Sequence, residues 1–264
     1  MSAISLIRRL QERALLVGVE VSSASAGAVE MIGGLAFDFM VIDARHAAVS
    51  VYSNELEQLL RSADLGGAPA LVRVGDNTPG TINRAMNDGA AGVVVTVRAA
   101  SEARAVVQSL RYPPFGQRGA APVVRAARYG LIPWDDYLEA TNHERPVIVA
   151  IDDIETIEIA GEIAAVEGVD AVVIEALGIA TSAGLASVGE VLDLTAVQAS
   201  LANLRNDDRV VGVGLPDSAD AAAWRDAGCS LLVVGSDVQA YVRATVELRA
   251  ELAVVPARIV EGAQ

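Results

Sequence analysis

The chain has 264 residues, a length that suits one α/β barrel or two smaller domains. Hydrophobic residues make up 52% of it and aromatic residues only 4%, so aliphatic side chains must fill the core. A formal net charge of -14 argues against nucleic acid and anionic membranes as partners, because both require a cationic surface.

Short apolar runs alternate with amphipathic segments from end to end. The runs are rich in Val, Ile and Leu, which is typical of parallel strands buried on both faces. The predicted strands are Leu15–Val21, Phe37–Asp43, Ala70–Val74, Gly92–Val97, Val147–Ile151, Ala171–Glu175, Val210–Gly214 and Ser230–Gly235. The predicted helices are Asn54–Ala63, Thr81–Asp88, Ser101–Leu110, Ile154–Glu167, Leu192–Asn206, Ser218–Ala227 and Val238–Val254. Eight such units predict a single (β/α)₈ TIM barrel, and no linker marks a domain boundary within residues 1–264.

Two segments interrupt this alternation. Arg111–Pro133 is a long connection that contains four prolines, and Ala176–Glu190 is a loop rich in Gly, Ala and Ser after the sixth strand. Long loops after barrel strands usually build the active site. We favour that role for both segments over the alternative of variable surface connections.

Missing residue types exclude several chemistries. All 20 basic residues are arginine, so a Schiff-base aldolase and lysine-linked pyridoxal phosphate are excluded for want of an amine nucleophile. The single cysteine, Cys229, excludes an intrachain disulfide and a cysteine-based zinc cluster. Arg8, Arg9 and Glu12 interrupt the apolar character of the first residues. We therefore expect no signal peptide or membrane span, and a cytoplasmic protein.

Three segments carry a resemblance to a known family: Val41–His46, which reads Val-Ile-Asp-Ala-Arg-His, Leu71–Arg73, and the proline-containing Arg111–Gly119. Together they resemble the pyruvate-dependent class II aldolases of 2-oxo acids, the family of 4-hydroxy-2-oxoheptanedioate aldolase and 2-dehydro-3-deoxyglucarate aldolase. The resemblance runs from about Leu16 to Val254. It implies a barrel in a homo-oligomer, a trimer or hexamer, whose last helix packs on a neighbouring subunit. Packing of that helix on its own barrel is the alternative.

The resemblance implies roles for three polar residues. His46 would move a proton through a water, Asp43 would orient the site, and Arg73 would hold the carboxylate and enolate oxygen of pyruvate. These residue types suit the roles, because imidazole titrates near neutrality and a guanidinium matches a carboxylate bidentately. An internal salt bridge with an acid at a neighbouring strand end is the alternative for Arg73. The expected substrate-binding residues are Arg73, Arg45, Leu177 and Gly178.

The metal ligands are where the sequence departs from the family, which binds a divalent ion through one Glu and one Asp. The matching positions are Asp152 and Gly178, and glycine offers no ligand. Magnesium and manganese need several hard oxygen ligands, so Asp152 is a weak candidate and Glu175, three residues before Gly178, is another. We expect no cofactor, with Mg²⁺ or Mn²⁺ as the alternative. Arg45 replaces a family Glu; it either pairs with Asp152 in the vacated volume or points outward.

These observations predict a metal-independent carbon–carbon lyase, or a related enzyme, acting on a small carboxylate or 2-oxo acid. Its reaction would be an aldol cleavage or an easier step, such as decarboxylation, elimination, tautomerisation or cyclisation. One alternative is a non-catalytic binding or assembly subunit that retains the barrel. Another is a metal-dependent class II aldolase with rearranged ligands.

Overall fold

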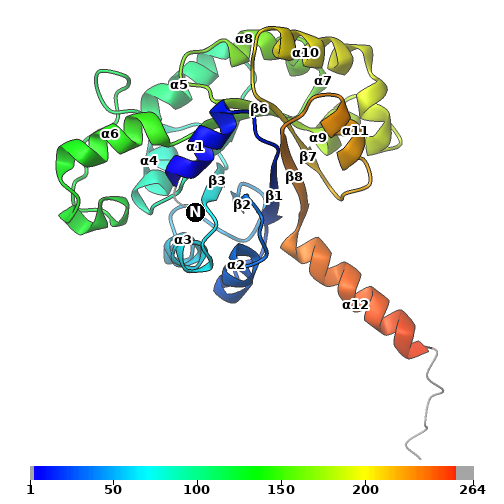
Figure 1. Ribbon diagram of the computed structural model, residues 1–264, viewed down its shortest axis with the longest axis horizontal. Coiled ribbons are helices and arrows are strands. Elements are labelled where there is room, and N and C mark those ends of the chain that lie inside the picture. The colour runs from blue at the N-terminus through cyan, green and yellow to red at the C-terminus, as the bar shows by residue number, and fades with distance from the viewer. Residues whose placement is uncertain (1–2, 254–264) are drawn as a thin grey trace, which may run out of the picture.

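The computed structural model describes residues 3–253, and within them eight parallel strands close into a barrel in the order of the sequence (Figure 1). The strands are β1 (Leu16–Val21), β2 (Phe39–Ala44), β3 (Ala70–Val74), β4 (Gly92–Thr96), β5 (Val147–Ile151), β6 (Ala171–Glu175), β7 (Val211–Leu215) and β8 (Leu231–Ser236). The pairing of Leu16 with Leu231 is part of the β1–β8 contact that closes the sheet. The predicted (β/α)₈ barrel is confirmed.

Helices surround the barrel (Figure 1). The α-helices are α1 (Ala3–Gln11), α2 (Ala26–Gly33), α3 (Asn54–Gly66), α4 (Pro79–Asn87), α5 (Ala100–Leu110), α6 (Trp134–Glu144), α7 (Ile154–Ile157), α8 (Ala160–Ala164), α9 (Ala176–Ser182), α10 (Thr195–Asn206), α11 (Ala221–Asp226) and α12 (Asp237–Ala253). The 3₁₀ helices are η1 (Arg125–Gly130) and η2 (Val188–Asp193). No helix in residues 3–253 combines the length and the apolar character that crossing a membrane requires.

Several helices differ from the predicted ones. The predicted helix Ile154–Glu167 is divided into α7 and α8, because Ile159 adopts φ -106° and ψ 14°, outside the helical region. Helix α9 begins directly after β6, inside the segment predicted as a loop from Ala176 to Glu190. Helices α1, α2 and α6 were not predicted from the sequence, although Leu6, Ile7 and Leu10 of α1 follow the helical period.

Two apolar layers hold the barrel together. Side chains on the outer face of the strands pack under the helices, and those on the inner face fill the barrel. The inner layer includes Leu16, Phe39, Val41, Leu71, Val94, Ile148, Val173 and Leu231. Because side chains alternate between the two faces of a strand, the next inward positions lie at the C-terminal mouth of the barrel. They are Glu20, Asp43, Arg73, Thr96, Asp152 and Glu175.

Helix α12 projects away from the barrel (Figure 1). Its first residue is tied to the barrel, since Asp237 Oδ1 accepts a hydrogen bond from Ser22 N at 2.8 Å. Farther along, its apolar side chains are open to solvent, including Tyr241 at 71% and Val246 at 62% exposure. The predicted last helix is therefore present, and it does not lie against its own barrel. Val254, its predicted last residue, falls outside the described residues.

Candidate functional site

Arg73 lies between two carboxylates at the mouth of the barrel. Its Nη2 donates to Glu175 Oε1 at 2.6 Å, and its Nη1 is 3.5 Å from Glu20 Oε2. Burial lowers the pKa of Arg73, but the charges of Glu175 and Glu20 and, farther off, Asp43 and Asp152 more than offset this and leave it raised. Arg73 is thus a firmly charged guanidinium. The internal salt bridge given above as its alternative role is present.

Glu175 reaches Arg73 because its neighbour in the sheet is a glycine. Gly214 pairs with Glu175 across β6 and β7, and a β-carbon at position 214 would collide with the Glu175 carboxylate. Burial raises the pKa of Glu175, and the charge of Arg73 opposes this rise. Glu175 is therefore bound to Arg73.

Asp43 orders the turn that follows β2. Its Oδ1 accepts hydrogen bonds from the backbone N of Arg45 at 2.8 Å and of His46 at 3.2 Å. Asp43 is buried, whereas His46 is exposed. The imidazole makes no hydrogen bond to any other described side chain, so it is open to a ligand. Asp43 thus positions His46 through the backbone.

Asp152 is bracketed by two arginines from different strand ends. Arg45 Nη2 lies 3.1 Å from Asp152 Oδ2, and Arg98 Nη2 lies 2.9 Å from Asp152 Oδ1. Arg45 Nη1 also donates to the Thr96 hydroxyl at the end of β4. Arg45 therefore points inward and pairs with Asp152, as one of the two sequence-based expectations proposed.

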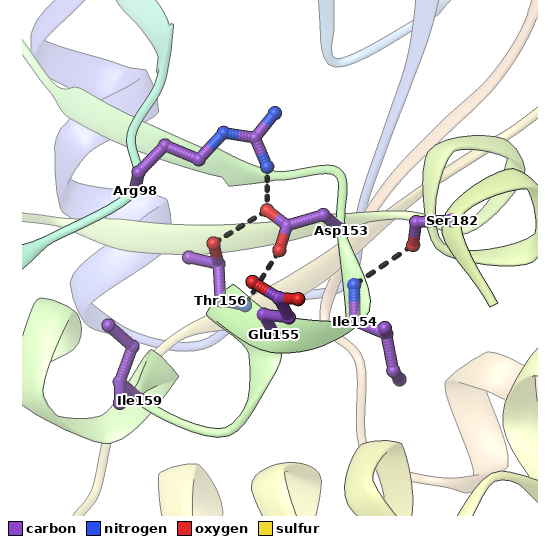
Figure 2. A pocket seen from close by; sticks show the side chains of 7 residues that line it. All are labelled: Arg98, Asp153, Ile154, Glu155, Thr156, Ile159 and Ser182. Carbon is purple, nitrogen blue, oxygen red and sulfur yellow. Dashed lines mark hydrogen bonds and ion pairs between the residues drawn. The ribbon is translucent and has the colours of Figure 1, made fainter.

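Arg98 also shapes a groove beside the mouth. Its Nη1 pairs with Asp153, whose carboxylate caps α7 by accepting from Thr156 N at 2.8 Å (Figure 2). On the other side, Ile154 N donates to Ser182 Oγ at 2.9 Å, which joins α7 to α9. Arg98 is thereby fixed at both ends of its guanidinium, next to Asp152 and next to Asp153.

Gly178 lies against Asp152 and leaves no room for a side chain. A β-carbon at position 178 would be 2.6 Å from the Asp152 carbonyl oxygen and 2.7 Å from its Cβ. Such distances are not tolerated between real atoms, so an aspartate at 178 does not fit this backbone. Among the described residues, no three His, Cys, Asp or Glu side chains are grouped so that they could hold a metal ion. The residues present do not fit a divalent cation.

A cavity of about 370 Å³ opens at the mouth, between the ends of the strands and the start of α12. Its polar lining includes Glu20, Asp43, His46, Arg73 and Glu175. Leu177, predicted to bind substrate, also lines it and is 59% exposed. The predicted substrate-binding residues Arg45 and Gly178 are not part of this lining and contact Asp152 instead.

Three polar residues of the mouth were missed in the sequence: Glu20, Thr96 and Arg98. Glu20 and Thr96 occupy inward positions of β1 and β4. Both could have been found in the sequence, because every second residue of a strand faces the same side and the inward apolar residues Leu16 and Val94 set the count. No comparable signal marks Arg98, which lies in the connection after β4.

The sequence is similar to known proteins over most of its length. A family model described as HpcH/HpaI aldolase/citrate lyase matches residues 17–244. The sequence is 37% identical over 163 residues to 2-dehydro-3,6-dideoxy-6-sulfogluconate aldolase from Pseudomonas putida. That alignment covers 61% of this chain and 62% of the Pseudomonas protein. The sequence is 34% identical over 230 residues to hydroxypyruvate/pyruvate aldolase from Delftia acidovorans. This second alignment covers 84% of this chain and 82% of the Delftia protein.

The fold has close counterparts among crystal structures. An HpcH/HpaI aldolase/citrate lyase family protein from Burkholderia cenocepacia superposes with a TM-score of 0.86 at 28% sequence identity. The superposition covers 95% of this chain and 99% of that one. Barrel, helices and strand order are therefore shared over almost the whole length of both proteins.

Proposed function

The chain belongs to the HpcH/HpaI aldolase/citrate lyase family, and we propose that it is a carbon–carbon lyase for small 2-oxo acids that works without a divalent metal. Relatives named as aldolases support a lyase of the aldolase type. The observation that carries metal independence is the bracketing of Asp152 by Arg45 and Arg98. Arg45 and Arg98 place a guanidinium against each oxygen of this carboxylate, and Arg98 is shared with Asp153.

In this proposal Arg73 holds the substrate carboxylate and the oxygen that becomes negative. Its Nη1 makes no hydrogen bond among the described residues, only a 3.5 Å ionic contact with Glu20, so the guanidinium keeps donor capacity although Nη2 is bound to Glu175. A charge-assisted hydrogen bond to a developing oxyanion is strongest where water is excluded. Arg73 is 8% exposed, which meets that condition.

His46 moves the proton. In an aldol cleavage it takes the proton of a 4-hydroxyl group, the C3–C4 bond breaks, and the electron pair of that bond passes into an enolate. A proton returned to C3 then gives the shorter 2-oxo acid, and the other fragment leaves as an aldehyde. Decarboxylation, elimination, tautomerisation and cyclisation can use the same enolate, and a guanidinium supports these easier reactions better than a demanding aldol cleavage.

We also propose a homo-oligomer, because α12 leaves its apolar side chains uncovered in a single chain. Tyr241, Val242, Val246 and Leu248 are all more than half exposed. A second subunit would cover them, and closed symmetry is the common outcome for such assemblies. Light scattering at micromolar concentration tests this, and a monomer would contradict it.

Calorimetry in the presence of a chelator tests the anion site. Pyruvate and its enolate mimic oxalate should bind the wild-type protein. Arg73→Lys keeps the charge but loses the planar geometry, so affinity should fall roughly 10- to 150-fold. Arg104→Lys, a change at an exposed arginine of α5, should bind like the wild type. If neither ligand binds the wild type, the non-catalytic binding or assembly subunit becomes the better account.

A further inference from the structure

The cavity at the barrel mouth carries more negative than positive charge. Glu20, Asp43 and Glu175 line it together with Arg73, the other charged residue of the lining, and with His46. Three carboxylates and one guanidinium give a formal charge of -2 when the imidazole is neutral. The adjacent arginines, Arg45 and Arg98, are matched by Asp152 and Asp153 and do not change this sum. A plain monocarboxylate would make the cavity more negative still.

Each of the three carboxylates also has an oxygen without a hydrogen-bond donor within residues 3–253. Asp43 uses Oδ1 for the two backbone amides, and Glu175 uses Oε1 for Arg73, so Oδ2 and Oε2 receive none. Glu20 Oε1 accepts from Ser22 Oγ at 3.0 Å, while its Oε2 has only the 3.5 Å ionic contact with Arg73. The cavity therefore presents several unused acceptors.

Arg73 supplies the complementary observation. It is more than nine-tenths buried and lines the cavity, and its Nη1 makes no hydrogen bond in the described part of the chain, only the 3.5 Å ionic contact with Glu20. A ligand that satisfies the site must accept from this guanidinium and donate to the carboxylates around it. Since both glutamates lie within 3.5 Å of Arg73, the accepting and donating groups of the ligand must lie close together.

A protonated amino group meets these requirements better than a hydroxyl group. An ammonium has three donors and a positive charge, whereas a hydroxyl has one donor and no charge. Resting on the proposed function, we propose that the natural 2-oxo acid carries a protonated amino group near its carboxylate, and that Glu20 is the residue that selects it. Glu20 is suited to selection because Ser22 holds it in place and it leaves the reacting oxygens to Arg73 and His46.

A matched ligand series tests the selection. 3-Aminopropanoate, 3-hydroxypropanoate, propanoate and malonate share a three-carbon chain and one carboxylate, and differ only in the distal group. Calorimetry with the full-length protein and a chelator should give the tightest binding for 3-aminopropanoate and the weakest for malonate. The ammonium should bind roughly tenfold or more tighter than propanoate, as expected for a charge-assisted hydrogen bond.

Glu20→Gln is the matching variant, because it keeps the shape and removes the charge. It should abolish the preference for 3-aminopropanoate over propanoate while propanoate still binds. Glu162→Gln, the same change at an exposed position of α8, should leave the preference intact. A thermal midpoint for each variant shows whether it is folded. The binding of the four ligands to the wild-type protein tests the preference even if a variant fails to fold.

The outcomes separate this inference from the proposed function. Equal affinity for all four ligands, tightest binding of malonate, or an unchanged preference in Glu20→Gln would overturn the amino-group selection and leave the 2-oxo-acid site standing. If pyruvate, oxalate and all four ligands fail to bind the wild type, both proposals are wrong.

Discussion

Gly178 and Asp152 are packed so closely that a β-carbon on Gly178 would lie 2.6 Å from the Asp152 carbonyl oxygen. This contact joins the start of α9 to the end of β5. The aldolases that the sequence resembles place a metal-binding aspartate at the matching position. In this protein, the same position is used to bring two backbone segments together, and the adjacent carboxylate is held by arginines.

Restoring an aspartate at this position should not restore a metal site. Gly178→Asp should lower the free energy of unfolding by about 1–3 kcal/mol, the usual cost of overpacking. Gly161→Asp is a suitable control, since a β-carbon at Gly161 meets nothing within 4 Å. Denaturant unfolding measures both variants, and added Mg²⁺ should stabilise neither. A Gly178→Asp protein that gains stability with Mg²⁺ would contradict the packing argument.

Arg45 should matter for the reaction although it lies outside the cavity lining. Arg45→Met removes one of the two charges on Asp152 and leaves a carboxylate less well compensated beside Arg73 and Glu175. We expect the rate of pyruvate methyl-proton exchange to fall roughly 10- to 150-fold, the value of one charge-assisted hydrogen bond. Arg104→Met, at the exposed position in α5, should exchange at the wild-type rate. Equal rates in the two variants would remove Arg45 from the site.

Asp170, just before β6, should make stability depend on pH. Burial raises its pKa to about 6, and the hydrogen bond from Val147 N and the charge of Arg111 only partly oppose the rise. A carboxyl whose pKa is higher in the folded state costs stability once it ionises, so this cost is absent at low pH and grows as the pH rises from about 4 to about 6.

The variant Asp170→Asn should therefore gain stability relative to the wild type as the pH rises through that window, by about 3 kcal/mol in total. Urea unfolding of both proteins below about pH 4 and above about pH 6 gives the difference. Asp207→Asn, at an exposed site after α10, is the control. If Asp170→Asn and the wild type differ in stability by the same amount below about pH 4 and above about pH 6, burial does not raise the pKa of Asp170.

Cys229 should be unreactive in the folded protein. It is 2% exposed, and burial raises its pKa to about 12. Thiolate, the reactive form, is therefore scarce at about pH 8, near the ordinary thiol range. A colorimetric disulfide reagent should titrate the thiol only after guanidinium is added. Rapid labelling of the native protein would show that Cys229 is accessible.

The barrel could be predicted because its strands read as separate apolar runs, and eight of them have one common architecture. The helices were harder to predict. The apolar residues of α7 and α8 follow one continuous helical period, but the backbone of Ile159 is not helical and divides the segment into two helices. For the site, the pairing of Arg45 with Asp152 was one of two alternatives that the sequence left open, because charge and position do not fix the direction of a side chain that follows a strand. The partners of Arg73 did not follow, because only the closed sheet shows that Glu20 and Glu175 meet it from β1 and β6.

We expect enolate chemistry on a 2-oxo acid to proceed in this protein without a divalent metal. Deuterium exchange into the methyl group of pyruvate, followed by proton magnetic resonance, measures enolate formation without knowledge of the natural aldehyde. The protein is dialysed against a chelator and assayed with the chelator, with added Mg²⁺ and with added Mn²⁺, beside Arg73→Lys and a protein-free blank. We predict exchange at the same rate in all three wild-type samples and a much slower rate in Arg73→Lys. Exchange that occurs only after Mg²⁺ or Mn²⁺ is added would contradict the claim.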